Sequence, residues 1–227
     1  ARGPDGEWRV LPDYVRTPVG AGYALENRLA MTRATDDALG VVNFLRLAPF
    51  FADFRQGMAA ICGRTDPRIA LLTPGRYNQS YAEQAHLARY LGILLVEGDD
   101  LTVRDGQLFV RTVEGVKRVD GLWRRMGTDL LDPLAFDARS TIGVPDLFEA
   151  IRNGGLALAN WPGAGVLETP VLAAFLPRLC RKLLGEPLLI PNVATWWCGQ
   201  DKERAFVRQN VDRLAIGSAF GRAVPAI

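Results

Sequence analysis

The sequence predicts an α/β fold with a mainly parallel sheet, and three observations support this. Residues 68–100 follow the order strand, helix, strand, which is the unit from which parallel sheets are built. Short apolar runs and helix-periodic segments continue to alternate along the rest of the chain. The 227 residues are 48% hydrophobic with a formal net charge of +2, so the chain can fill the core of one large domain or two small ones.

The first 66 residues are predicted to contain one strand and two helices. The strand covers 8–11, a glycine-rich turn follows it, and the helices cover 23–33 and 44–61. Residues 65–67, with the sequence Thr-Asp-Pro, predict a boundary between this segment and the next.

The strand, helix, strand unit is the most complete signal in the chain. An apolar run at 69–72 leads into a Pro-Gly turn, and Ser80 with Glu83 three residues later predicts a capping box at the start of a helix. Gly92 is expected to end that helix, and residues 93–96 form a second buried strand.

Elements of both kinds alternate after residue 100. Asp105 and Gly106 lie between two alternating runs and predict a β-hairpin. Pro177 is expected to kink or split a helix that begins after residue 169. Further strands are expected at 119–123, 156–159, 188–190 and 214–216, and further helices at 145–152 and 202–211.

The turn after the first strand of the unit supplies the first candidate site residues. In open α/β sheets ligands bind beyond the carboxyl ends of the strands, so this turn and residues 97–100 are expected on one rim. Backbone N–H groups and the helix dipole could hold an anion there, and the alternative is a turn that needs Pro and Gly only for its shape. The candidates are Thr73, Gly75, Tyr77 and Asn78.

Acidic residues follow the second strand of the unit. Glu97, Asp99 and Asp100 can bind a sugar hydroxyl, an amine or a metal if their carboxylates converge. The alternative is a solvated turn with no ligand.

Two arginines end the strand near residue 123. Alternation predicts that one of Arg124 and Arg125 points inward and one outward. An inward arginine needs an anionic ligand or a buried ion pair. We expect one of them to contact residues 73–78 or an anion held there.

A third strand-to-helix segment, ANWPGAG at 159–165, adds Asn160, Gly163 and Gly165 as candidates. The two glycines would let a ligand approach the backbone. The segment fails the dinucleotide fingerprint because the position of the third glycine holds Glu168. No GxxxxGK loop occurs in the chain, so it has no P-loop motif.

Composition disfavours several function classes. The near-neutral charge gives no argument for nucleic acid or a membrane surface, and no apolar run reaches the roughly 18 residues of a membrane helix. The three cysteines lack CxxC spacing, which favours a reducing, cytoplasmic setting. His86 is the only histidine, so a catalytic triad has one candidate base. Cys198 is expected to be packed beside Trp196 and Trp197 rather than reactive, and the two tryptophans are expected to be core or interface residues.

An ordered set of segments resembles the circularly permuted ATP-grasp family, type 2. The resemblance covers nearly the whole chain. The family consists of bacterial proteins related to the synthetase domain of glutathionylspermidine synthase. The segments are WRVLPDYVRTPVGAGYALENRLAMTR (8–33), LLTPGRYNQSY (71–81), LVEGDDLTVRDG (95–106), LWRRMGTDLLDPLAF (122–136), GVPDLFEAIRNGGLALAN (143–160) and LLIPNVATWWCGQ (188–200).

The resemblance implies a division of the chain. Residues 67–200 would be a Rossmann-like pre-ATP-grasp domain that shapes the substrate side. Residues 1–66 would be an N-terminal α+β portion of the ATP-grasp module, and 201–227 would lead toward an ATP-binding segment that the chain lacks.

The resemblance also implies a ligase reaction, in which ATP phosphorylates a carboxylate and an amine attacks the acyl phosphate to form an amide. ATP and magnesium would serve the intact module. The implied partners are a small carboxylate or amine substrate and a companion α-helical domain or protein, with no nucleic acid and no membrane.

The chain departs from the family pattern near its start. Many members have Glu-Asp-Asn before an Arg-Thr-Pro segment, and here the corresponding residues are Pro12, Asp13 and Tyr14. Only Asp13 could bind magnesium, so no metal site is assigned. Arg16 and Thr17 match the family and are substrate- or anion-binding candidates.

A second departure lies near the other end, where Gly217 and Ser218 stand in place of a basic residue and a proline. Neither ATP nor magnesium is therefore expected to bind tightly to this chain alone, and no catalytic residue is assigned.

Three hypotheses remain. The chain is the substrate-side half of a carboxylate-amine ligase and belongs to a longer protein, or it is a degenerate non-catalytic module that binds a ligand or a partner. The third is a nucleotide-binding oxidoreductase domain, because Glu97 follows Gly75 by about the distance of a ribose-binding acid.

Overall fold

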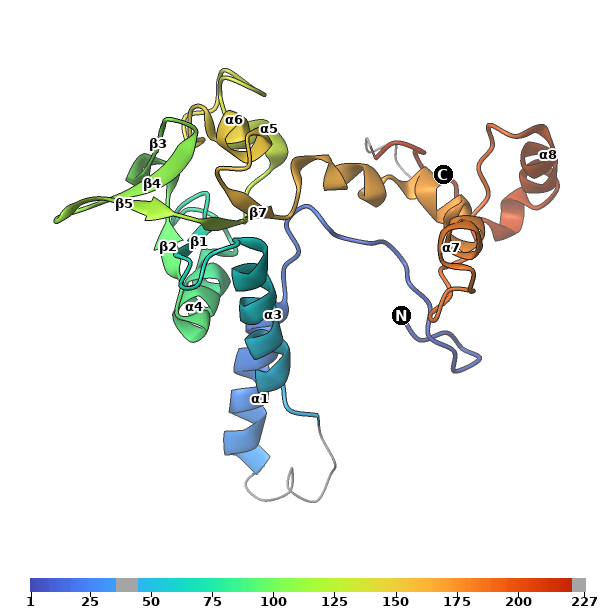
Figure 1. Cartoon of the computed structure of the whole chain (residues 1–227). Helices are drawn as coiled ribbons and strands as arrows, with labels where there is room; N and C mark the ends of the chain where they lie inside the picture. The colour runs from blue at the N-terminus through green and yellow to red at the C-terminus, as the bar shows by residue number, and fades with distance from the viewer. Residues whose placement is uncertain (36–44, 222–227) are drawn as a thin grey trace. The chain divides into compact units, whose positions relative to one another are not determined.

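The computed structural model describes residues 1–35 and 45–221, and the chain forms two compact units (Figure 1). Unit 1 consists of Ala1–Val15 and Gly163–Ile227, and unit 2 consists of Arg16–Pro162. The assignment of 1–66, 67–200 and 201–227 to parts of an ATP-grasp module stays a prediction.

Unit 2 contains a four-stranded parallel sheet with the strand order β2-β1-β6-β7. A fold of mixed α/β class with a parallel sheet is therefore confirmed. The strands are β1 (Ile69–Leu72), β2 (Leu94–Val96), β6 (Gly121–Arg124) and β7 (Ala157–Ala159).

A three-stranded antiparallel sheet, β3-β4-β5, is inserted between β2 and β6 in the chain. The predicted hairpin between its first two strands is confirmed. Asp105 and Gly106 have φ angles of 50° and 68°, which are the left-handed values that a two-residue type I′ turn requires. The strands are β3 (Leu101–Arg104), β4 (Gln107–Thr112) and β5 (Gly115–Val119).

The helices of unit 2 largely follow the predicted positions. Gly92 ends α4 in the left-handed conformation, as expected. Residue 44, where one helix was predicted to begin, lies outside the described residues. The helices are α1 (Ala21–Thr35), α3 (Ala48–Ile61), α4 (Tyr81–Leu91), α5 (Thr128–Leu131) and α6 (Leu147–Arg152), with a 3-10 turn η1 (Gly98–Asp100).

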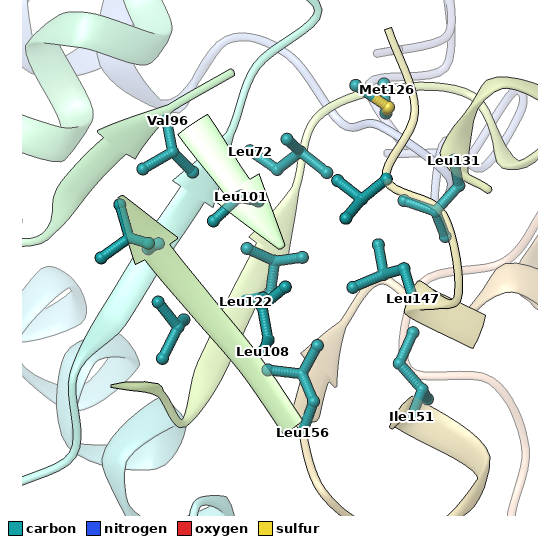
Figure 2. Close-up of a cluster of buried hydrophobic side chains, with 14 residues drawn as sticks. Leu72, Val96, Leu101, Leu108, Leu122, Met126, Leu131, Leu147, Ile151 and Leu156 are labelled. Atoms are coloured by element: carbon teal, nitrogen blue, oxygen red, sulfur yellow. The ribbon is translucent and has the colours of Figure 1, made fainter. Parts of the chain in front are cut away.

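The parallel sheet carries an apolar core on each face because neighbouring residues of a strand point to opposite sides. On one face Leu71 packs in a cluster with residues of α1, α3 and α4. Figure 1 shows these three helices beside the parallel sheet. On the other face Leu72 and Leu122 pack with the antiparallel sheet, α5 and α6, and Figure 2 shows this cluster. The second strand of the unit is less buried than predicted, because β2 lies at the sheet edge and leaves Leu94 39% exposed.

The regular elements of unit 1 are all helices or 3-10 turns among its described residues, and long irregular segments connect them. Pro177 lies in the first turn of α7, so the predicted split of the helix that follows residue 169 is confirmed. Val207 is the one buried hydrophobic residue of the described part of this unit. The elements are η3 (Pro170–Ala174), α7 (Leu176–Leu184), α8 (Asp201–Gln209) and η4 (Val211–Arg213), and η2 (Pro162–Glu168) begins at the last residue of unit 2.

The strands predicted at 8–11, 188–190 and 214–216 are wrong. Within the described residues of unit 1 the backbone makes only isolated bridges, including one between Val10 and Asn192. A strand needs a neighbouring backbone to pair with, and these apolar runs do not lie beside one over several residues.

None of the helices in the described part of the chain has the length and apolarity needed to cross a bilayer.

The close packing after β2 predicts opposite effects for two glycine substitutions. A Cβ at Gly98 would lie 2.2 Å from the backbone oxygen of Ile142, whereas a Cβ at Gly57 in α3 meets nothing within 4 Å. We expect Gly98→Ala to lower the free energy of unfolding by roughly 1–3 kcal/mol. The matched change Gly57→Ala should raise it by roughly 0.5–1 kcal/mol, because alanine favours a helix interior.

Urea denaturation of the two variants beside the original chain measures both effects. If the Gly98→Ala variant is as stable as the original chain, the close approach of Gly98 to the backbone of Ile142 is contradicted.

Candidate functional site

The carboxyl ends of the four parallel strands lie on one edge of the sheet, which we call the rim. Thr73, Glu97, Arg125 and Asn160 follow β1, β2, β6 and β7 respectively. In the strand order β2-β1-β6-β7, β2 is added on one side of β1, and β7 is added on the opposite side of β6. The direction in which strands are added therefore reverses between the neighbouring strands β1 and β6. This reversal is the position where open α/β sheets bind ligands.

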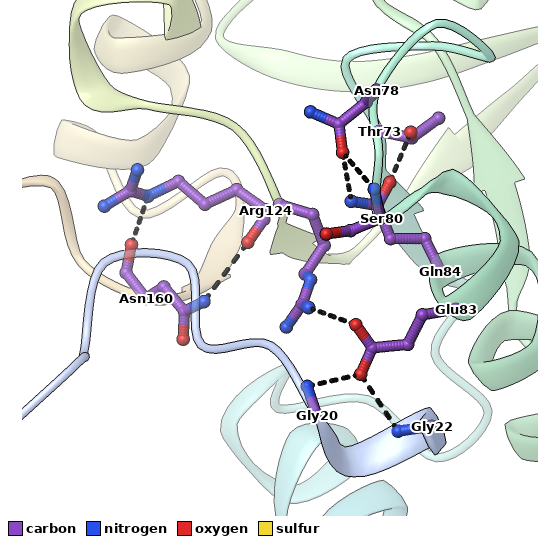
Figure 3. Close-up of polar contacts among 10 residues, drawn as sticks. Gly20, Gly22, Thr73, Asn78, Ser80, Glu83, Gln84, Arg124 and Asn160 are labelled. Atoms are coloured by element: carbon purple, nitrogen blue, oxygen red, sulfur yellow. Dashed lines mark hydrogen bonds and ion pairs between the residues drawn. The ribbon is translucent and has the colours of Figure 1, made fainter. Parts of the chain in front are cut away.

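A buried carboxylate, Glu83 of α4, connects three elements at the rim (Figure 3). Its Oε1 atom accepts hydrogen bonds from the backbone N–H groups of Gly20 (2.7 Å) and Gly22 (3.0 Å), which begin α1. Its Oε2 atom lies 3.5 Å from Nη2 of Arg125. Both charged side chains are almost fully buried, at 0% and 2% exposure.

The predicted capping box at Ser80 and Glu83 is therefore wrong. The Ser80 N–H donates instead to Oδ1 of Asn78 (2.9 Å), and the Ser80 side chain makes no cap hydrogen bond. Glu83 caps α1 rather than its own helix, because the N–H groups in the first turn of α1 have no partner within that helix.

The glycine-rich turn explains why α1 can approach Glu83. Gly20 has a φ of 120°, which side-chain-bearing residues rarely adopt. A Cβ at Gly22 would lie 2.6 Å from Cγ of Glu83 and 3.2 Å from Cγ of Leu87. Sequence reasoning missed this contact, although the Gly-Ala-Gly spacing at a helix start was its signal.

Arg125 is held by more than its ion pair. Its guanidinium lies over the ring of Trp123, 5.2 Å from the ring centroid, and its Nε atom is buried without a hydrogen-bond partner. Burial lowers the pKa of Arg125, and the nearby charge of Glu83 opposes this shift.

Arg124 is also buried, so the predicted inward and outward alternation of the two arginines is wrong. Its Nη1 and Nη2 groups donate to the backbone oxygens of Met126 (2.7 Å) and Trp161 (3.2 Å). Its Nε group donates to the oxygen of Asn160, whose side-chain amide donates back to the Arg124 oxygen (3.2 Å). The segment after β7 thus covers the end of β6 and leaves no outward side for Arg124.

Hydrogen bonds connect the side chains of the turn after β1, and Thr73 is the buried residue at its start. Thr73 Oγ1 donates to Oε1 of Gln84 (2.5 Å) and accepts from the Gly75 N–H (3.2 Å). Gln84 also reaches Oδ1 of Asn78 (3.5 Å; Figure 3). Tyr77, by contrast, is 90% exposed.

The acidic residues after β2 reach the same edge, and their backbone forms η1. A Cβ at Gly75 would lie 3.0 Å from Oε2 of Glu97, so this carboxylate adjoins the turn after β1. Asp100 accepts the Glu97 N–H (2.9 Å) in a capping box of η1. Glu97, Asp99 and Asp100 are exposed. The expected contact of an arginine with residues 73–78 stays a prediction.

The remaining candidates are divided between the units. Arg16 and Thr17 open unit 2 shortly before α1, whereas Asp13, Gly163 and Gly165 belong to unit 1. Asp13 is exposed. Within residues 1–35 and 45–221, no three His, Cys, Asp or Glu side chains gather in a way that could hold a metal ion.

The two tryptophans of unit 1 pack on other aromatic rings. Ring centroids of Trp196 and Phe206 are 4.9 Å apart, and those of Trp197 and Phe175 are 5.8 Å apart. Cys198 is exposed and lies with both tryptophans along a cavity of about 520 Å³. Cys198 thus lines the same cavity as the tryptophans but is not buried by them, and its expected lack of reactivity stays a prediction.

The chain is similar to known proteins over nearly its whole length. The family model described as circularly permuted ATP-grasp type 2 matches residues 1–226. An uncharacterized protein of Synechocystis is 37% identical over 216 residues, which cover 94% of this chain and 45% of that protein. An uncharacterized protein of Mycobacterium tuberculosis is 38% identical over 220 residues, which cover 96% of this chain and 25% of that protein. The chain thus spans about half the length, or less, of the curated relatives that it matches.

The buried ion pair predicts a large stability effect at Glu83. We expect Glu83→Gln to lower the free energy of unfolding by roughly 3–5 kcal/mol, because it leaves the Arg125 charge buried without a counter-charge. The matched change Glu26→Gln, at a glutamate whose side chain is 58% exposed, should cost less than about 0.5 kcal/mol.

Denaturant unfolding of both variants provides the measurement. The double variant Glu83→Gln with Arg125→Met should recover part of the loss, because it removes the unpaired charge. A Glu83→Gln variant as stable as the Glu26→Gln variant would contradict the role of this carboxylate.

Proposed function

We propose that this chain, which belongs to the circularly permuted ATP-grasp type 2 family, is the substrate-side portion of an ATP-dependent carboxylate-amine ligase. Such an enzyme joins a carboxylate to an amine as an amide or peptide bond. On this proposal, the parallel sheet that begins at residue 69 is the Rossmann-like pre-ATP-grasp part, and its rim faces the substrate.

One observation carries the proposal beyond family membership. Four parallel strands end at one edge, and the polar segments that follow them include the candidates predicted from the sequence. The buried pair of Glu83 and Arg125 fixes α1, α4 and β6 at that edge, so the groups that remain exposed are positioned by a rigid support.

The exposed groups of the rim carry both signs of charge. Arg76, stacked on the ring of Tyr77 at 5.0 Å, offers a guanidinium to a substrate carboxylate. Glu97, next to Gly75, offers a carboxylate to a substrate ammonium group. A site that orders a carboxylate and an amine near each other would lower the entropic cost of joining them.

Magnesium does not fit the described residues of this chain. They contain no cluster of acidic ligands, and Asp13 lies between a proline and a tyrosine, neither of which is a good ligand for magnesium. We therefore assign no step through ATP or a metal to these residues. On this proposal the phosphorylation step would require residues other than those that the structure describes in this chain.

A degenerate module that binds a ligand or partner without catalysis is the second candidate. The observation that favours it is that both rim arginines are buried against groups of the protein itself. An α-helical companion domain or protein would then be the partner. The oxidoreductase hypothesis has no support from the family match and is not proposed.

Calorimetry with magnesium and ATP separates these proposals. We expect this chain alone to bind ATP no more tightly than roughly 1 mM, whereas the full-length Synechocystis relative binds it in the micromolar range. In the relative, adding the correct carboxylate and amine together should increase ADP release.

Micromolar binding of ATP by this chain alone would contradict the proposed division of labour. A full-length relative that neither binds nor consumes ATP would favour the non-catalytic module instead.

A further inference from the structure

A cleft of about 680 Å³ lies at the opposite edge of the same sheet, where β1 and β2 begin. We call it the amino-edge cleft. It is formed by α3, the segment before β1 and the start of β2. The residues that line it include Arg55, Gln56, Asp66, Arg68, Ile93 and Leu94.

The cleft lies within unit 2 and away from the rim. Ile69 lines the cleft and Leu72 is the last residue of the same strand, so the strand separates the two edges by roughly 10 Å. A ligand bound in the cleft would therefore not contact the residues of the rim turn.

Arg68 is fixed beside the cleft without a carboxylate of its own. One of its Nη1 hydrogens donates to the backbone oxygen of Arg118 (2.8 Å), and its backbone N–H donates to Asp120 (2.9 Å). The buried Asp120 carboxylate instead faces the guanidinium groups of Arg64 (3.2 Å) and Arg118 (3.0 Å). Among residues 1–35 and 45–221, no carboxylate therefore forms an ion pair with Arg68.

Arg55 supplies a second positive charge on the other wall. It is exposed on α3 and makes no hydrogen bond or ion pair with the described residues of the chain. Two guanidinium groups, one held by a backbone oxygen and one exposed on α3, suit a carboxylate, because an arginine can bind a carboxylate through two parallel hydrogen bonds.

The same cleft has features that select among anions. Asp66 also lines it and has no ion partner in the described structure, so it disfavours ligands with several negative charges. Ile93 and the partly exposed Leu94 offer apolar surface beside the arginines. The volume lies within the range of roughly 300–1,000 Å³ that small-molecule sites occupy.

We propose that the amino-edge cleft binds a small organic monocarboxylate that carries an aliphatic group. Its carboxylate contacts Arg55 and Arg68, and its aliphatic part packs on Ile93 and Leu94. The site is separate from the ligase substrate site at the rim, and it stands whether or not the proposed ligase activity is found.

The probe is N-acetyl-leucine, which has one carboxylate, an aliphatic side chain and no amino charge. We expect saturable chemical-shift changes at the backbone amides of Arg55, Gly92 and Leu94 when the isotope-labelled chain is titrated with it. Arg55→Gln should weaken binding by about tenfold, because a charge-assisted hydrogen bond is lost. Arg104→Gln, which removes the same charge from an exposed hairpin position, should leave the affinity unchanged.

Inorganic phosphate is the second probe, and we expect it to bind more weakly than N-acetyl-leucine because of Asp66. The proposal is overturned if no saturable shifts occur up to about 20 mM probe. A dissociation constant of about 20 mM corresponds to a favourable binding free energy near 2 kcal/mol. It is also overturned if phosphate binds as tightly as the carboxylate, or if both arginine variants have the same affinity.

Discussion

The rim of unit 2 depends on one buried carboxylate, that of Glu83. A charge removed from water is costly unless other charges and hydrogen bonds replace the solvent. Here two N–H groups at the start of α1 and the guanidinium of Arg125 replace it. The positive end of the α1 dipole adds to this compensation. Because Glu83 lies on α4 and its partners lie at the start of α1 and directly after β6, these three elements cannot shift independently without exposing an uncompensated charge.

Because of this constraint, the buried rim groups support the structure, and recognition of a substrate falls to the exposed rim groups. Arg124 and Arg125 look like ligand-binding groups in the sequence, yet their donors serve the backbone after β7 and Glu83. The groups left facing solvent include Arg76, Tyr77 and the acidic residues after β2. A substrate would therefore be recognised by exposed side chains on a rigid frame, which is the arrangement that precise positioning requires. At the amino-edge cleft the buried Asp120 similarly accepts the backbone N–H of Arg68, which lines the cleft.

The sequence could predict the elements whose signals are local. The hairpin at Asp105 and Gly106 and the end of α4 at Gly92 depend on left-handed backbone conformations that few residues adopt, so they were predicted correctly. The capping box was wrong because the spacing of Ser80 and Glu83 does not reveal a competing partner 61 residues away in the chain, at Gly22. The burial of both arginines was likewise hidden, because Arg124 is covered by the segment after β7 and Arg125 pairs with Glu83, which is distant in the chain.

Hydrogen exchange of the Gly20 and Gly22 amides tests the central role of Glu83 most directly. Gly20 directly precedes α1 and Gly22 lies in its first turn, where the N–H groups have no partner within the helix, and Glu83 accepts both. At neutral pH we expect them to exchange at least about a hundredfold more slowly than in an unfolded chain, like the Ala24 amide that is bonded within the helix. Exchange of both glycine amides at the unprotected rate, with Ala24 still protected, would contradict the account.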